Sequence, residues 1–207
     1  MIRAVTAAVV RRGAVVAKSG LVSPHHVGIV REDAAPSNEG TLPVWDAESG
    51  GLDERAAAFD LVADDELGED DVERLHAWVT TLLASGVKTE YACIPEYSIE
   101  DRNGTEVHRM SCAGFVAEAY RRIGRQLVES RELPVLGSKE LVSIWPPLAR
   151  LPTKQRERIG LLQSDERRDG GFRVLIPAYL LHALDLPPSA RPLHPTGDHV
   201  GFELTGE

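Results

Sequence analysis

The pattern of hydrophobic and polar positions divides the chain into a β-rich first third and a helical middle. The first third contains short runs of Val, Ile, Thr and Ala separated by Gly, Pro and polar residues, a pattern typical of strands joined by turns. We predict a small antiparallel sheet from it. Its strands are residues 2–10, 14–18, 25–30, 41–47 and 56–62, with turns at residues 31–40 and 48–54.

Two later segments have apolar residues at helical spacing. Residues 70–85 are predicted to form an amphipathic helix that begins within the acidic run 64–71 and ends at Gly86. A second helix is predicted to start near Cys112 and to end at Gly124. Its apolar face is formed by Phe115, Val116, Ala119, Tyr120 and Ile123.

The remaining segments have weaker patterns. Residues 87–110 are predicted to be a long connection without regular structure, a kind of loop that often carries function. Residues 125–171 are rich in Pro and in charged residues. In the C-terminal third we predict short helices at residues 138–145 and 178–184, a solvated helix or loop at 154–168, and strands at 172–176 and 198–204.

Composition and charge indicate a globular protein and exclude some partners. The chain has 207 residues, of which 43% are hydrophobic, and this suits one domain with a sizeable core. The net charge of -9 argues against nucleic acid or an anionic membrane surface as the main partner. No apolar run is long enough to span a bilayer, and the N-terminal run suits a strand better than a signal peptide. We therefore expect a soluble, cytoplasmic protein, with its oligomeric state left open.

Cys112 is the best candidate for a nucleophile. Two cysteines are too few for a disulfide framework, and no Cys/His spacing indicates a zinc site. Ser111 is predicted to cap the helix, which puts Cys112 in the first turn, where the helix dipole and free N–H groups favour a thiolate. Two alternatives stay open: a buried structural cysteine, and a disulfide between Cys93 and Cys112.

A nucleophilic thiol needs a base and a group that orients the base. In its predicted strand, His26 points to the same face as Gly28, whose missing side chain leaves room for a helix to pack beside the histidine. If this strand pairs with the next, Asp46 lies beside His26 and holds one ring nitrogen, so the other faces the thiol. Cys112, His26 and Asp46 would then form a Cys–His–acid site. Taken singly, His26 could be a strand-edge histidine and Asp46 an acid near a turn.

Two of these segments resemble a known family. Residues 111–116, Ser-Cys-Ala-Gly-Phe-Val, with Tyr120 downstream, resemble the cysteine-helix motif of the NlpC/P60 papain-like hydrolases, normally Asp-Cys-Ser-Gly-Phe-Val. Residues 26–30, His-Val-Gly-Ile-Val, resemble the histidine strand of that family. The histidine precedes the cysteine, an order similar to that of the circularly permuted branch, which includes YiiX-like and lecithin:retinol acyltransferase-like proteins. Ser111 and Ala113 depart from the usual Asp and Ser.

The resemblance covers residues 20–62 and 70–124 and implies an α+β, papain-like fold. In such a fold a small antiparallel sheet or barrel packs against the cysteine-bearing helix and one further long helix. The resemblance also implies that Asp46 is the acid of the site. It makes Tyr91, together with Ser111 and the backbone N–H at the helix start, a candidate for binding the oxyanion or substrate.

The resemblance implies a single catalytic domain and an activity. The activity is hydrolysis of an amide bond in a peptide, an isopeptide or a cell-wall peptide, through an acyl-enzyme and without a metal or organic cofactor. Two alternatives stay open: an acyltransferase or esterase acting on a lipid-type substrate, and a catalytically silent fold that binds a ligand or a protein partner. The domain, residues 1–207, is divided into a β-rich half at 1–63, helices at 64–124, and an extension at 125–207 without a family counterpart, which could form a lid.

Other histidines compete for the role of base. His199-Val-Gly-Phe repeats the sequence of His26-Val-Gly-Ile, and in the unpermuted order His199 would be the base. We prefer His26, because a full strand with an acid follows it, whereas few residues follow His199. His108 precedes Cys112 by four positions and could also approach the site.

Overall fold

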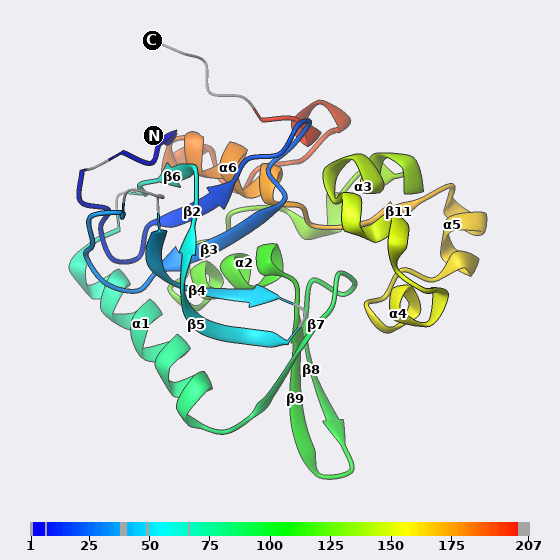
Figure 1. The fold of residues 1–207 in the computed structure, drawn as a ribbon, viewed down its shortest axis with the longest axis horizontal. Helices are drawn as coiled ribbons and strands as arrows, with labels where there is room; N and C mark the ends of the chain where they lie inside the picture. Colours follow the sequence, from blue (N-terminus) through cyan, green and yellow to red (C-terminus); the bar gives the residue numbers. More distant parts are fainter. Residues whose placement is uncertain (1, 7, 38–40, 49, 66, 203–207) are drawn as a thin grey trace.

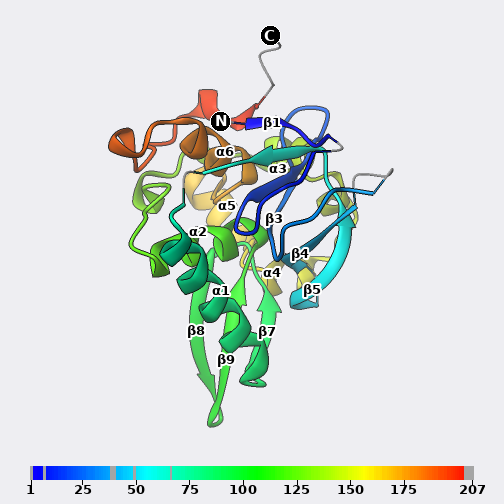
Figure 2. The same ribbon diagram turned by 90° about the vertical axis from the view of Figure 1, so that its left-hand side faces the viewer.

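The chain folds as a mixed α+β structure, so the predicted fold class is confirmed at this level (Figure 1). The computed structural model describes residues 2–6, 8–37, 41–48, 50–65 and 67–202. The predicted antiparallel sheet has six strands among these residues, and a separate three-stranded sheet extends away from it (Figure 2). The order in the larger sheet is β1 (Ile2–Ala4), β6 (Leu61–Ala63), β2 (Val15–Lys18), β3 (His26–Val30), β4 (Thr41–Glu48) and β5 (Gly51–Ala58).

Strand β3 lies between β2 and β4 and is buried along its whole length. Because side chains alternate along a strand, β3 contributes to two apolar clusters. Val27 and Ile29 belong to the large cluster that includes the cysteine-bearing helix, whereas Val30 packs with Val44 and Phe59 on the other face. Both faces of the sheet are therefore covered at β3.

Helix α1 (Glu69–Ala84) confirms the predicted helix at residues 70–85. Leu75, Val79 and Leu82 are its buried residues, and Gly86 follows the helix end with a φ of 69°, in the left-handed region that glycine adopts readily. The first turn carries Glu69, Asp70 and Asp71, whose charges are favourable at the positive end of the helix dipole.

Helix α2 (Cys112–Arg122) lies in the middle of the molecule and contacts α1, β3 and β4 (Figure 1). Ser111 is its N-cap, as predicted, because the Ser111 hydroxyl accepts a hydrogen bond from the Gly114 backbone N–H at 2.9 Å. Gly114 is needed for a close approach, since a Cβ there would lie 1.7 Å from the carbonyl oxygen of Glu96. The same carbonyl accepts the Ser111 backbone N–H at 3.1 Å, so the helix start is fixed against the preceding loop.

Residues 87–110 are not the unstructured connection that we predicted. They form a three-stranded sheet whose strands are rich in charged residues. Ion pairs such as Arg109 to Glu100, at 3.0 Å, cross this sheet, and its hydrophobic alternation is therefore weak. The sheet delivers the chain directly to Ser111. Its strands are β7 (Lys88–Tyr91), β9 (Thr105–Met110) and β8 (Tyr97–Arg102), with β7 parallel to β9 and β8 antiparallel to it.

Some strand predictions in the first third are only partly correct. The strand predicted at residues 2–10 is limited to β1, and the strand predicted at 56–62 is divided between β5 and β6. The turn predicted at 48–54 is too long, because Gly51 (φ 104°) already begins β5. Residues 38–40 and 49, which belong to the predicted turns, lie outside the described residues.

The extension consists mainly of short helices that pack on the first two thirds of the chain. Helix α6 (Pro177–Asp185) contacts α2, β1 and β6, and a buried ion pair of 2.9 Å joins Arg191 to Asp65. The helices are α3 (Ser138–Ile144), α4 (Thr153–Arg158), α5 (Gln163–Asp169) and α6 (Pro177–Asp185), with 3₁₀ turns η1 (Ser130–Glu132), η2 (Pro146–Arg150), η3 (Pro188–Ala190) and η4 (Gly197–Val200).

Two helix predictions in the extension are confirmed by α3 and α6, but both strand predictions need correction. The strand at 172–176 is reduced to β11 (Phe172–Arg173), which pairs with β10 (Val135–Leu136). The strand at 198–204 is wrong: its described part falls in η4 and the two residues after it, and residues 203 and 204 lie outside the described residues. The chain turns there because the ring of His199 accepts the backbone N–H of Thr196 at 3.0 Å.

No helix within the described residues is long and apolar enough to cross a membrane. Helix α1 has 16 residues but carries charges along its exposed face, and the more apolar α6 has only nine residues.

Candidate active site

Cys112 is the first residue of α2 and lines a cavity of about 50 Å³. The residue is 4% exposed, and its thiol is free. Its backbone N–H donates to no described residue, because the first N–H groups of a helix have no partner within the helix. The start of α2 therefore presents a thiol and an unused N–H donor side by side.

The pairing of β3 with β4 brings an imidazole and a carboxylate together. Gly28 lies opposite Asp46 in the ladder, so His26, two residues earlier, is the diagonal neighbour of Asp46. Nε2 of His26 lies 2.8 Å from Oδ2 of Asp46, and both residues are buried. Since Asp46 holds Nε2, the ring nitrogen available to the thiol is Nδ1, the arrangement that the strand pattern suggested.

Gly28 has a different role from the one that we expected. A Cβ there would lie 2.9 Å from the carbonyl oxygen of Trp45, 3.2 Å from the Cβ of Asp46 and 3.5 Å from the ring of Phe59. The missing side chain therefore makes room for Asp46 and Phe59 rather than for a helix. The Phe59 ring stacks on His26 with centroids 6.0 Å apart, so the imidazole has an apolar support.

Arg55 and Glu48 belong to the site, although sequence reasoning did not identify them. Arg55 donates to Oδ2 of Asp46 through Nε at 3.0 Å and Nη2 at 2.6 Å, and to Glu48 through Nη1 at 2.7 Å. Burial acts to raise the pKa of Asp46, but the hydrogen bonds from His26 and Arg55 outweigh it and lower that pKa. The Arg55 hydrogen bond likewise lowers the pKa of Glu48. Both carboxylates are thus held ionised beside the imidazole.

His26 is held in its charged form. Burial acts to lower its pKa, but the negative charge of Cys112 and the hydrogen bonds and charge of Asp46 and Cys112 raise the pKa from 6.5 to about 9. Cys112 is therefore one of the groups that hold the proton on the His26 ring. A protonated imidazole beside a thiol is an arrangement that stabilises a thiolate.

The same residues offer ligand atoms for a cation. The donor atoms of His26, Asp46 and Glu48 lie within 4.8 Å of one another. The guanidinium of Arg55 contacts both carboxylates and supplies the positive charge that a metal ion would bring. A cation would have to displace Arg55 and deprotonate His26, so the donor set does not fit a resident metal.

Tyr91 reaches the site from the end of β7. Its hydroxyl lies 4.0 Å from the sulfur of Cys93, and its ring lies 6.1 Å from that of Trp145. Burial, followed by the charges of Cys93 and Cys112, raises the pKa of Tyr91 well above its usual value, so the hydroxyl keeps its proton and can donate it. The hydroxyl of the other predicted oxyanion residue, Ser111, is engaged as the helix cap.

The alternative histidines are held elsewhere. The His199 ring lies in η4, 5.0 Å from the ring of His182, and its contacts in the described structure are within the C-terminal segment. His108 lies in β9 rather than in a loop. Its ring nitrogens are 2.7 Å from the Tyr97 hydroxyl and 2.7 Å from a Glu106 carboxylate oxygen. Of these three histidines, His26 is the one that interacts with Cys112, and its neighbour His25 lines the small cavity with the thiol.

Cys93 and Cys112 line the same small cavity, and both thiols are free. The disulfide that the sequence left open is therefore absent between these two described residues. Burial is the main cause that raises the pKa of Cys93, to about 12. Cys93 is a neutral thiol at ordinary pH, whereas Cys112 has an imidazolium beside it.

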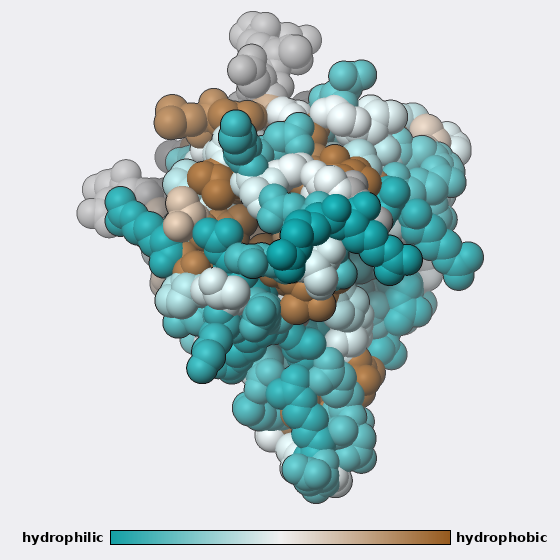
Figure 3. All heavy atoms as spheres, turned by 90° about the vertical axis from the view of Figure 1, so that its right-hand side faces the viewer, coloured by the Kyte–Doolittle hydropathy of each residue, from teal (hydrophilic) through white to brown (hydrophobic). Residues whose placement is uncertain are grey.

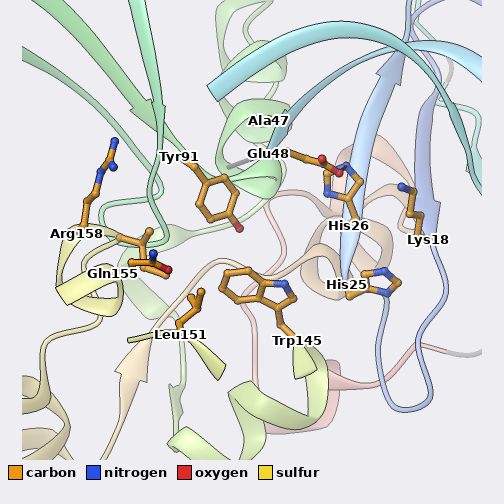
Figure 4. A pocket seen from close by; sticks show the side chains of 11 residues that line it. Lys18, His25, His26, Ala47, Glu48, Tyr91, Trp145, Leu151, Gln155 and Arg158 are labelled. Atoms are coloured by element: carbon orange, nitrogen blue, oxygen red, sulfur yellow. Dashed lines mark ion pairs between the residues drawn. The ribbon is translucent and has the colours of Figure 1, made fainter. Parts of the chain in front are cut away.

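A second cavity, of about 440 Å³, adjoins the first and lies between the sheet and the extension (Figure 4). The two cavities share His25, Tyr91 and Trp145. In Figure 4, Lys18, His25 and His26 flank one side of this cavity, and the extension supplies the opposite side.

The outer face of the extension, formed by α3–α5, is hydrophilic, with apolar groups near its middle (Figure 3). The lining from the extension is Trp145, Leu151, Gln155, Arg158 and Ile159, none of which sequence reasoning had named.

The extension is fixed to the site through its backbone. The carbonyl oxygen of Ile159 accepts the backbone N–H groups of Cys93 at 2.8 Å and Ile94 at 3.1 Å. Gly160 (φ 88°) permits this approach, since a Cβ there would lie 2.0 Å from the carbonyl oxygen of Ile94. The extension thus forms a fixed wall of the cavity. No protein-family model, curated protein or solved structure matches the chain, so its function is argued from this geometry.

Proposed function

We propose that the protein is a cysteine hydrolase that cleaves an amide bond through an acyl-enzyme, with a permuted papain-like fold of the NlpC/P60 type. The observation that carries the proposal is the cluster of Cys112, His26 and Asp46. Three separate elements, α2, β3 and β4, supply these residues, and each side chain is buried. Covalent acyl transfer by a cysteine requires a nucleophilic thiol, an imidazole that moves the proton, and a carboxylate that orients the imidazole.

The mechanism assigns one step to each residue. The thiolate of Cys112 attacks the carbonyl carbon and forms a C–S bond. His26 gives its proton to the amine as the C–N bond breaks, and then takes a proton from the water that hydrolyses the thioester. Asp46 keeps Nε2 of His26 engaged, so that Nδ1 carries the transferred proton.

The negative oxygen formed during attack needs donors close to Cys112. The backbone N–H of Cys112 is one, because it donates to no described residue. The Tyr91 hydroxyl is the second, because it remains protonated and Tyr91 lines the same small cavity as Cys112. No metal or organic cofactor has a role in this mechanism.

The arrangement of elements supports the papain-like proposal. The cysteine helix α2 packs against β3 and β4, and the long helix α1 packs against α2. The histidine strand precedes the cysteine helix in the chain, as in the permuted branch that the motifs resemble. At the two departures from the motif, the Ser111 hydroxyl caps the helix and Ala113 is buried.

The test is the rate of Cys112 alkylation by iodoacetamide against pH, in a Cys93→Ser background. We expect fast alkylation that persists below about pH 8, the range of an ordinary thiol, and that is lost in His26→Ala. His194→Ala, which changes an exposed histidine, is the matched control, and His199→Ala tests the competing base. A thiol that reacts slowly and is indifferent to His26 would refute the catalytic proposal and leave a fold that binds a ligand or partner.

One observation favours a second candidate, acyl transfer or ester hydrolysis on a lipid-type substrate. Leu21 and Val22 are exposed at the tip of the loop between β2 and β3, and Lys18 and His25 on either side of this loop line the large cavity. An exposed apolar tip can insert into a lipid surface. Co-sedimentation with neutral phosphatidylcholine vesicles, lost in a Leu21→Ser, Val22→Ser variant, would support it. Equal sedimentation of both proteins would remove this support.

A further inference from the structure

The large cavity contains a cation without an ionic partner, although the chain is acidic overall. Lys18 forms no ion pair with any described residue, and its ammonium lies 5.2 Å from the ring centre of Phe59. Of the cavity's other charged groups, Glu48 already accepts a hydrogen bond from Arg55, and Arg158 reaches Glu90 only at 4.0 Å. The ammonium of Lys18 is thus available in the cavity to bind an anionic group of a ligand, in a protein whose net charge is -9.

The unpaired cation lies beside the proton donor. Lys18 is the direct cross-strand partner of His26 in the ladder of β2 and β3. Such partners have Cβ atoms about 5 Å apart, and Figure 4 shows both side chains on the same side of the cavity. Because His26 protonates the departing amine, the leaving group must lie next to His26, and therefore next to Lys18.

The charge on the leaving group can be specified further. Lys18 neighbours the proton donor, so an anion that pairs with it must lie within a few bonds of the departing nitrogen. A carboxylate on the carbon that bears the nitrogen meets this condition. Phosphate esters on a long side chain would place their charge farther from His26. The neighbouring imidazole of His25, whose pKa is lowered by burial and by the charges of His26 and Lys18, offers a neutral hydrogen-bonding group at the same place.

We propose that the substrate is an N-acyl or peptidyl amino acid with a free carboxylate, and that Lys18 binds this carboxylate so that hydrolysis releases the amino acid. The inference rests on the proposed function. The C–N bond to the amino acid breaks as the Cys112 C–S bond forms, and the amino nitrogen takes its proton from His26. Water then breaks the C–S bond and releases the acyl part as a carboxylic acid. The acyl part lies toward Tyr91, Trp145 and the small apolar cavity.

The test compares two matched mixtures: N-acetylalanyl-amino acids, and the same compounds as carboxamides. Release of amino acid or amino acid amide is followed by mass spectrometry, and protection of Cys112 from iodoacetamide reports binding without turnover. The variants are Lys18→Gln, Lys18→Arg and, as the matched control, Lys139→Gln, which changes an exposed lysine of α3. We expect the wild type to prefer the free acids about tenfold or more, the size expected of a hydrogen bond to a charged group.

In Lys18→Gln we expect this preference to disappear, because kcat/KM on the free acids falls about tenfold or more. Lys18→Arg should retain most of the preference, and Lys139→Gln all of it. Equal use of acids and carboxamides, or no release and no protection by the acids, would overturn the inference while His26-dependent alkylation still supports the hydrolase. A Cys112 that alkylates slowly and independently of His26 would overturn both.

Discussion

Replacing Asp46 with Asn tests how the site holds its imidazole. Oδ2 of Asp46 accepts from Nε2 of His26 at 2.8 Å and from Arg55 at 2.6 and 3.0 Å, and the residue is 1% exposed. Asn has nearly the same shape and keeps one acceptor oxygen. The substitution therefore removes a negative charge and leaves the packing in place.

The size of the effect follows from the pKa of His26. The rise from 6.5 to about 9 corresponds to roughly 3 kcal/mol in favour of the imidazolium, at 1.36 kcal/mol per pH unit. A hydrogen bond to a charged group contributes roughly 1.5–3 kcal/mol. Since burial opposes the charged ring, we expect Asp46→Asn to lower the pKa of His26 by about one to two pH units.

The assay is an NMR titration of the His26 ring in the wild type, Asp46→Asn and Asp53→Asn. Asp53 lies opposite Asp46 in the ladder of β4 and β5 but is exposed. Its replacement by Asn therefore removes the same charge from a neighbouring position. Alkylation of Cys112 that depends on the imidazolium should weaken at a pH about one to two units lower in Asp46→Asn alone. An unchanged His26 titration in Asp46→Asn, or an equal change in Asp53→Asn, would refute the reasoning.

Three further predictions concern packing, pH and the oxyanion. Gly114→Ala places a Cβ 1.7 Å from the Glu96 carbonyl oxygen, so the free energy of unfolding in urea should fall by about 1–3 kcal/mol; an unchanged value would mean that the loop moves freely. Because folding raises the pKa of His26, its charge stabilises the fold fully below pH 6.5, and this stabilisation is lost as the pH rises through about 9. The difference in unfolding free energy between wild type and His26→Gln should therefore shrink by about 3 kcal/mol across that range, and a difference independent of pH would contradict it. Tyr91→Phe should lower kcat about 100- to 1000-fold with KM and Cys112 alkylation unchanged, whereas an equal loss of alkylation would mean that the hydroxyl acts on the thiol.

The core of the candidate site could be predicted because side chains alternate along a strand, which determines the residues that share a face. Val27 and Ile29 had to face the core, which sent His26 to the other face of its strand. Asp46 then fell within reach of the ring. Capping chemistry did the same for Cys112, since Ser111 fixes where the helix starts.

The missed parts depend on contacts that a linear pattern does not contain. The sheet formed by β7, β8 and β9 has few buried positions and is held partly by ion pairs, so its strands do not alternate clearly. Arg55 lies in β5, and its role in the site depends on the pairing of β5 with the neighbouring strand β4. The strand predicted around His199 was wrong because a strand needs a neighbouring strand to pair with. The chain there turns back on Thr196 instead.

The cavity is built from two separate stretches of the chain, and this separation matters for how such a protein can diversify. The thiol, imidazole and carboxylate come from residues 26–112, whereas the facing wall comes from residues 145–159. The wall is anchored by main-chain hydrogen bonds from Cys93 and Ile94, which do not depend on the wall's side chains. Mutations in the wall can therefore change which molecules are accommodated while the reactive residues stay in place, so paralogues could acquire new preferences without first losing the chemistry.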